Sequence, residues 1–174
     1  MTPLERPRQA GFSVVELMIT VAIAAIIASI AVPSFNELIV QNRLSSQANE
    51  LVAGVSLART SAIETNSSGG LCPANASLSG CGGSWQNGWV AWADVNGNGN
   101  ADADEVLSVG TINEKDLLAG LAEIRFDGRG RREVPAAGNA TLRLSAVECP
   151  SGKGFVRTLT VTPVGSVSSG KGNC

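Results

Sequence analysis

An unbroken apolar segment near the N-terminus constrains this chain more than any other feature. The segment runs from Phe12 to Val32 and holds one charged residue, Glu16. About 20 apolar residues are enough to cross the hydrocarbon core of a bilayer as a helix, because a helix satisfies its own backbone hydrogen bonds. The sequence therefore predicts a membrane-spanning helix over residues 12–35.

Charged residues beside the apolar segment indicate its orientation. Arg6 and Arg8 precede it against one acid, Glu5, and basic flanks favour the cytoplasmic side. No A-x-A site follows it, so a cleaved secretory signal is not indicated. The plain interpretation is a signal-anchor helix. A carboxylate such as Glu16 costs about 2.5–3.5 kcal/mol at the centre of a membrane helix, and less near the interface, so we expect Glu16 to have a function.

The start of the segment carries a more specific pattern. Gly11-Phe12-Ser13-Val14-Val15-Glu16 followed by an apolar helix resembles the class III leader of type IV prepilins and type II secretion pseudopilins. The resemblance implies that residues 1–11 are a leader, that prepilin peptidase cuts between Gly11 and Phe12, and that the new amine of Phe12 is methylated. It also implies that residues 12–35 pass from the inner membrane into the core of a filament of other pilins.

The resemblance gives Glu16 a role in assembly. Its carboxylate would pair with the terminal ammonium of a neighbouring subunit, because each charge is costly alone in an apolar environment. The resemblance further implies a single-pass inner-membrane protein with a periplasmic C-terminal domain, which later reaches the cell-surface pilus.

The amino-acid composition limits which catalytic and metal sites the chain can form. The chain has no His and no Tyr, which excludes His-based triads and His metal sites; we expect no enzymatic activity and no cofactor. Four cysteines lie in the exported part, where an even number indicates disulfides. Three pairings are possible, and we prefer Cys72–Cys81 with Cys149–Cys174, since the first closes a short Gly/Ser/Pro loop. A zinc site is not indicated because CxxC spacing is absent.

Periodicity beyond the apolar segment predicts the fold class. Apolar residues recur at helical spacing over residues 36–66, which predicts an amphipathic helix that ends near the Asn/Ser/Gly cluster at 66–70. We interpret its charges, Arg43 and Arg59 included, as a solvated flank. Residues 67–174 contain short β-type runs at 89–93, 106–109, 122–126, 141–147 and 155–161. The sequence predicts an α+β, pilin-like fold, in which a long N-terminal helix packs on an antiparallel β-sheet or sandwich. Arg143 and Arg157 should face outward, and the Gly/Ser-rich tail at 165–174 should be flexible.

Residues 85–105 combine tryptophans with a loop rich in Asp, Asn and Gly. The pattern W-x-x-G-W followed by D-x-N-x-N-G resembles the GspH/FimT group of minor pilins and pseudopilins. The same loop fits the spacing of a calcium-binding EF-hand loop. Its oxygen-bearing candidates are Asp94, Asn96, Asn98, Asn100, Asp102 and Glu105, with Gly99 at the turn position. Strands rather than helices flank this loop, and a hairpin tip needs these residue types anyway, which favours a solvated hairpin over bound calcium.

Charge is distributed unevenly along the chain. Residues 12–124 hold three basic and eleven acidic residues, net −8, whereas residues 125–174 hold eight basic and three acidic, net +5. This asymmetry favours a polyanion as partner of the C-terminal part. At its centre, Gly128-Arg129-Gly130-Arg131-Arg132 combines flexible glycines with guanidiniums that can fork onto phosphate oxygens.

This cluster is similar to the G-R-x-R motif of the FimT-type minor pilins, which bind DNA in natural transformation. The resemblance implies contact of double-stranded DNA with Gly128, Arg129, Gly130 and Arg131, helped by Arg132 and by Lys171, which a disulfide at Cys174 would bring near. The alternative is a hairpin of solvated arginines, or arginines paired with acidic neighbouring subunits. Two functions therefore stay open: a DNA-binding minor pilin, and a structural, GspH-like minor pseudopilin of a type II secretion system that binds no nucleic acid.

Overall fold

The computed structural model describes residues 11–174, so residues 1–10 of the expected leader lie outside the described part. Helix α1 spans Val14–Thr65, and the chain divides into two compact units, one up to Ile39 and one from Val40 to Cys174.

In the first unit, the helix is apolar enough to cross a membrane and its side chains are exposed. Two of its hydroxyl groups donate to the helix backbone: Thr20 Oγ1 donates to the Leu17 carbonyl at 2.8 Å and Ser29 Oγ donates to the Ile26 carbonyl at 2.7 Å. Exposed apolar side chains with satisfied polar groups suit a lipid or apolar protein environment.

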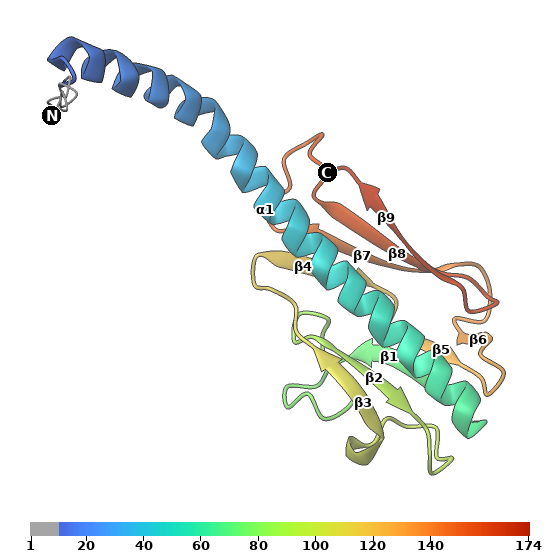
Figure 1. The fold of residues 1–174 in the computed structure, drawn as a ribbon. Helices are drawn as coiled ribbons and strands as arrows, with labels where there is room; N and C mark the ends of the chain where they lie inside the picture. The colour runs from blue at the N-terminus through green and yellow to red at the C-terminus, as the bar shows by residue number, and fades with distance from the viewer. Residues whose placement is uncertain (1–10) are drawn as a thin grey trace, which may run out of the picture. The chain divides into compact units, whose positions relative to one another are not determined.

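The second unit begins with the amphipathic part of α1 (Figure 1). Its buried face consists of Leu44, Gln47, Ala48, Leu51, Gly54, Val55, Ala58 and Ala62. The helix ends at Thr65, where Asn66 adopts φ +50° and the amide of Ser67 donates to the Ala62 carbonyl at 3.1 Å. A left-handed residue after the last turn is a common way to terminate a helix, and Asn tolerates it. The helix therefore ends where the sequence predicted.

Two antiparallel sheets pack against this helix face. The first has the order β3-β2-β1-β5-β6, with β1 Gly69–Pro73, β2 Trp89–Ala93, β3 Val106–Gly110, β5 Ile124–Phe126 and β6 Arg132–Val134. The second has the order β4-β7-β8-β9, with β4 Asp116–Gly120, β7 Ala140–Ala146, β8 Val156–Val161 and β9 Val167–Gly172. A short 3-10 helix, η1, spans Ala103–Glu105. One core joins the helix to both sheets, with Leu51, Leu71, Phe126, Leu144 and Leu159 all buried. The predicted α+β, pilin-like class is confirmed.

Two segments differ from the expectation. Gly69 and Gly70 belong to the cluster that was expected to end the helix, but they start strand β1, where a side chain on Gly70 would collide with the carbonyl of Ile124 on β5. The tail was expected to be flexible, but Val167–Gly172 forms β9, paired with β8 along its whole length. Ser and Gly carry little strand preference of their own. Backbone hydrogen bonds to β8 hold this edge strand, and Val167 at its start packs against the core.

The structure contains the two disulfides that the sequence analysis preferred. Cys72 and Cys81 close the loop after β1 with a Cα–Cα distance of 5.5 Å, and Cys149 and Cys174 join the β7–β8 loop to the chain end at 5.3 Å. The second disulfide fastens the end of β9.

Two arginines that were expected to be solvated are structural. Arg43 forks onto Asp116, with Nε–Oδ2 and Nη2–Oδ1 distances of 2.7 Å, and Gln47 donates to the same buried carboxylate. The hydrogen bond to Asp116 raises the pKa of Arg43. Arg157 does not face outward: its Nη2 donates to Ser45 Oγ at 3.0 Å, and burial lowers its pKa. Arg143 is exposed, as expected.

Candidate nucleic-acid interface

The arginine cluster lies in the turn between β5 and β6. The amide of Gly130 donates to the carbonyl of Asp127 at 2.8 Å, and the amide of Asp127 donates to the carbonyl of Arg131 at 2.9 Å. The Asp127 carboxylate accepts the amides of Arg129 at 3.0 Å and Arg131 at 2.8 Å. Because these amides already have partners, they are not free to cradle a phosphate. The groups left to bind a ligand are the exposed side chains of Arg129 and Arg131.

The two glycines of the motif face the helix rather than solvent. An ideal Cβ on Gly128 would lie 2.8 Å from the backbone carbon of Asn66, and one on Gly130 would lie 2.5 Å from Ile63 Cδ1. Gly130 is buried and has φ +72°, a left-handed conformation that favours glycine. The glycines thus let the turn lie directly on the end of α1, and their role is packing.

Arg59 on α1 holds this turn against the helix by hydrogen bonds. Its Nε donates to the carbonyl of Gly130 at 2.7 Å, and its Nη2 donates to the carbonyl of Val164 at 3.3 Å. The helix therefore joins the β5–β6 turn to the β8–β9 turn. Sequence analysis treated Arg59 as a solvated charge, and no local pattern marks it, because its partners are more than 70 residues away.

Arg132 is not part of the exposed cluster. It is 5% exposed, and its guanidinium donates to the carbonyls of Pro135, Gly138 and Thr162. Burial lowers its pKa. The expectation that Arg132 helps to bind DNA is wrong, since strand alternation turns it inward from its neighbours.

Lys171 is also separated from the arginine turn. It lies on β9 opposite Arg157, and its Nζ donates to Gln41 Oε1 at 2.9 Å. Gln41 and Arg59 are about 27 Å apart along α1 at 1.5 Å per residue. The disulfide at Cys174 therefore holds Lys171 at the opposite end of the unit, and the expected approach to the arginines does not occur.

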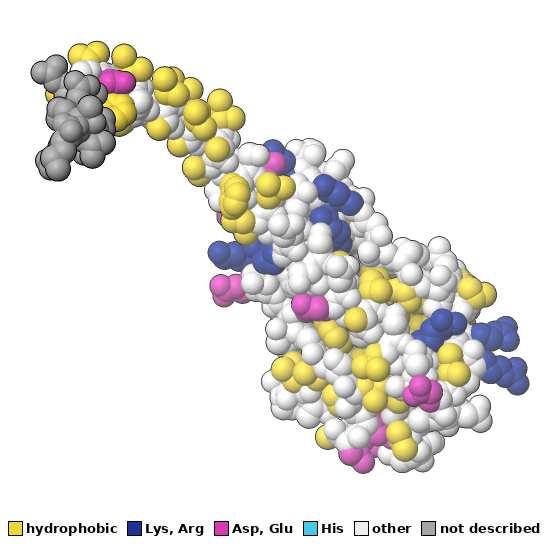
Figure 2. All heavy atoms as spheres, viewed as in Figure 1, with side chains coloured by type: hydrophobic (Ala, Val, Ile, Leu, Met, Phe, Trp, Pro, Cys, Tyr) yellow, Lys and Arg dark blue, Asp and Glu magenta, His cyan; other side chains and the backbone are white. Residues whose placement is uncertain are grey.

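Basic side chains gather where the turn reaches the surface. Figure 2 shows Lys and Arg side chains projecting beside the position that β6 occupies in Figure 1. Among the described residues, neither Arg129 nor Arg131 has a side-chain hydrogen bond or ion pair. The arrangement presents two unpaired cations on a rigid turn, which suits a phosphate backbone.

The Asp/Asn-rich loop between β2 and β3 uses its oxygens internally. Asp94 accepts the amides of Gly97 at 2.8 Å and Gly99 at 2.9 Å, and Glu105 Oε1 accepts the amides of Val95 at 2.7 Å and Asn96 at 2.9 Å. These bonds explain why both carboxylates can be buried.

A third, half-buried carboxylate of this loop, Asp102, is bonded in the same way. Asp102 accepts hydrogen bonds from the side-chain amides of Asn96 at 2.9 Å and Asn98 at 2.6 Å, which lower its pKa. Within residues 11–174, no group of three His, Cys, Asp or Glu could hold a metal ion. The loop therefore forms a hairpin tip whose carboxylates accept hydrogen bonds from its own amides.

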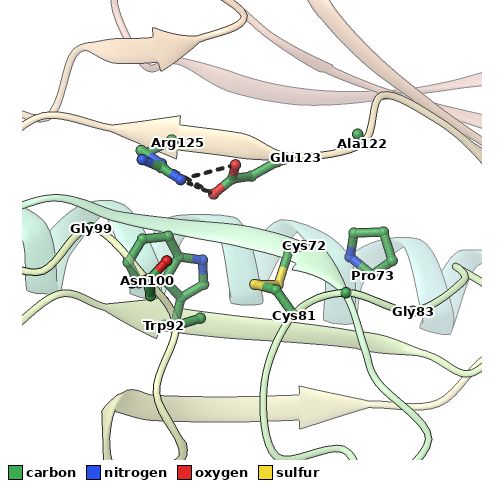
Figure 3. A pocket seen from close by; sticks show the side chains of 12 residues that line it. Cys72, Pro73, Cys81, Gly83, Trp92, Gly99, Asn100, Ala122, Glu123 and Arg125 are labelled. Carbon is green, nitrogen blue, oxygen red and sulfur yellow. Dashed lines mark hydrogen bonds and ion pairs between the residues drawn. A yellow bond between two sulfur atoms is a disulfide. The ribbon is translucent and has the colours of Figure 1, made fainter.

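A cleft of about 370 Å³ lies on the outer face of the first sheet (Figure 3). Arg125 stacks over the ring of Trp92 at 5.3 Å and forks onto Glu123, and the Cys72–Cys81 disulfide forms the other side. Because Glu123 neutralises Arg125, this cleft does not attract a phosphate.

The remaining candidate residues lie at the N-terminal end of α1. Gly11 and Phe12 precede the helix and are exposed, and Glu16 lies in its first turn, where its amide donates to Ser13 Oγ at 3.2 Å.

Comparisons with known proteins agree with this fold. The family described as type II transport protein GspH matches residues 47–165, and the prokaryotic N-terminal methylation motif matches residues 6–32. The crystal structure of the type IV minor pilin FimU from Pseudomonas aeruginosa (strain PAO1) is similar, with a TM-score of 0.53 and 18% identity over 74% of this chain and 88% of that one. Curated proteins gave no significant match.

The likeness to FimU supports the fold, and the GspH match, which covers more than half of the chain, supports the family. The methylation motif coincides with the start of the apolar helix and indicates a membrane-anchored pilin that later enters a pilus. The family implies assembly with other pilins and processing by prepilin peptidase. The chain therefore belongs to the GspH family, as a type IV minor pilin or pseudopilin.

Proposed function

We propose that this minor pilin binds double-stranded DNA through Arg129 and Arg131 and supports DNA uptake in natural transformation. One observation carries the proposal: the β5–β6 turn satisfies its own backbone and still projects two exposed guanidiniums without partners among the described residues. A turn that is already ordered loses little conformational entropy when its side chains bind.

The chemistry predicts weak binding without sequence preference. Guanidiniums fork onto phosphate oxygens, which are the same in every sequence. The turn exposes only the two arginines, which leaves few groups to read base edges in the major groove. Affinity should be micromolar or weaker at physiological salt, as is usual for backbone contacts alone. Each phosphate contact should contribute about −0.9 to the slope of log K against log salt.

Two further observations support the proposal. Residues 125–174 carry a net charge of +5, which favours a polyanion as partner of this part of the chain. The turn also keeps the G-R-x-R pattern that resembles the DNA-binding minor pilins, although Gly128 and Gly130 pack on α1 and only the arginines remain for contact.

The test is fluorescence anisotropy of labelled duplex DNA with the full chain in a neutral detergent. Arg129→Ala with Arg131→Ala should nearly abolish binding and leave thermal stability unchanged, since exposed side chains usually contribute less than ~0.5 kcal/mol. The matched control is Lys115→Ala with Arg143→Ala, which removes the same charge from two exposed sites, one just before β4 and one on β7. Arg43 is unsuitable as a control because it holds the buried Asp116. Equal loss in both double variants would show that net charge, not the turn, binds DNA.

The second candidate function is a structural minor pseudopilin of a type II secretion system. The match to the family described as type II transport protein GspH favours it. In this case Arg129 and Arg131 would contact acidic groups of neighbouring subunits. Absence of DNA binding by the wild-type chain at low salt would select this function over the first.

We also propose that prepilin peptidase cuts between Gly11 and Phe12, that Phe12 is then methylated, and that Glu16 guides assembly. Phe12 and Glu16 both lie in the exposed apolar unit, where an unpaired charge is costly in lipid. Pairing the Glu16 carboxylate with the terminal ammonium of a neighbour would offset this cost.

A further inference from the structure

A groove runs beside the arginine turn, between α1 and the β8–β9 turn. Its cavity of about 420 Å³ is lined by Ser56, Arg59 and Thr60 of the helix and by the segment 164–167. Ser56, Thr60 and Ser166 are exposed. The groove is therefore open, polar along its rim, and built from the same elements that support the turn.

Arg59 makes this groove electropositive. Its Nε and Nη2 atoms donate to the carbonyls of Gly130 and Val164, while Nη1 has no partner among the described residues. No Asp or Glu lines the groove. Three other cavities in the described part lack this combination: Glu123 lines the cleft beside Trp92, Glu50 lines a cavity beside Trp89, and Asp116 pairs with Arg43 in another. An unneutralised guanidinium in a groove without carboxylates favours an anion.

The groove and the arginine turn form one continuous surface. Arg59 contacts both, and Gly165 packs so closely on the carbonyl of Gly130 that a side chain there would collide with it. A DNA strand held by Arg129 and Arg131 would therefore pass next to the groove.

We propose that this groove is a second phosphate subsite of the DNA surface, with Arg59 as its cation. The proposal rests on the proposed DNA binding. In it, Arg59 keeps its two carbonyl contacts and donates from Nη1 to a phosphodiester oxygen, so the bound strand contacts three arginines instead of two.

Ser166→Asp tests the subsite without disturbing the turn. The side chain of Ser166 does not hold the fold, because Ser166 contacts Thr162 through its own backbone amide and carbonyl. An aspartate there would offer Arg59 a competing anion inside the groove. Anisotropy with the full chain in neutral detergent should show affinity about fivefold weaker than wild type, since a screened charge pair at contact is worth about that factor.

Ser151→Asp is the matched control. It makes the same substitution at an exposed serine in the β7–β8 loop, beside the Cys149–Cys174 disulfide. The DNA affinity of Ser151→Asp should differ from that of the wild type by less than twofold. Both variants should have the melting temperature of the wild type. Equal affinity of Ser166→Asp and Ser151→Asp would overturn the subsite.

Arg59→Gln provides a second measurement, because losing one phosphate contact should reduce the salt slope by about 0.9. An unchanged slope would also overturn the subsite. Failure of the proposed function looks different: the wild type would bind no DNA, or Arg129→Ala with Arg131→Ala would bind as tightly as wild type.

Discussion

Gly130→Ala tests whether the glycines of the arginine turn serve packing or ligand contact. The new Cβ would lie 2.5 Å from Ile63 Cδ1 and 3.2 Å from Arg59 Nε, at a backbone φ of +72°. The left-handed conformation costs a residue with a Cβ about 1 kcal/mol. Overpacking costs about 1–3 kcal/mol, and Ile63 is 46% exposed and can shift, so the lower value applies. We expect destabilisation of about 2 kcal/mol in total.

Gly138→Ala separates these two costs. Gly138 has φ +66°, but nothing lies within 4 Å of its Cβ position, so only the backbone cost of about 1 kcal/mol should appear. The assay is thermal unfolding of the full chain in detergent, followed by fluorescence of Trp85, Trp89 and Trp92, all of which are buried in the second unit. Gly130→Ala should melt roughly 4 °C below Gly138→Ala.

The same variants should differ in DNA affinity. Gly130→Ala should weaken binding several-fold because the turn must lift from α1, whereas Gly138→Ala should not. Adding Ile63→Ala should restore much of the affinity by making room for the new methyl group. Equal melting temperatures for the two glycine variants would refute the packing argument. A loss of DNA binding by Gly130→Ala that Ile63→Ala does not rescue would show that the glycine contacts DNA directly.

Three other predictions concern the rest of the chain. Arg43→Ala should destabilise the domain by about 3 kcal/mol, because it leaves the carboxylate of Asp116 buried without its cation; urea unfolding measures this. Asp102→Asn should destabilise the hairpin at neutral pH, and its difference from wild type should shrink as the pH falls below 3.8, because the folded-state pKa of Asp102 is lowered; melting at pH 7 and pH 3 checks the sign. Mass spectrometry of membrane protein should find N-methyl-Phe12 at the mature end, and Glu16→Ala should insert into the membrane but enter filaments poorly.

Sequence patterns predicted correctly those features that depend only on residues close together in the chain. The apolar segment, its leader pattern and the helical spacing up to Thr65 identified the anchor and the fold class, because helix periodicity and membrane length are properties of neighbouring residues. The turn position of Arg129 and Arg131 was also visible, since glycines at alternate positions mark a turn.

Tertiary structure decided what each charge does. Arg43, Arg59 and Arg157 look like solvated residues in the sequence, but each has partners more than 70 residues away along the chain. Arg132 was expected to help bind DNA because it adjoins the G-R-x-R pattern, and Lys171 because a disulfide at Cys174 would bring it near. Arg132 is buried because side chains alternate between the two faces of a strand. Lys171 lies at the other end of the domain because it is on β9, opposite Arg157 of β8.

The Gly/Ser-rich tail is a second feature whose structure depends on residues that are distant in the sequence. Val167–Gly172 has no apolar alternation, and it becomes a strand because β8 supplies its backbone partners and the disulfide of Cys174 fixes its end. The sequence by itself determined that an apolar helix carries a β-rich domain with a basic turn. Only the folded chain decided which arginines remain free at that turn, because burial and pairing depend on residues that are distant in the sequence and adjacent in space.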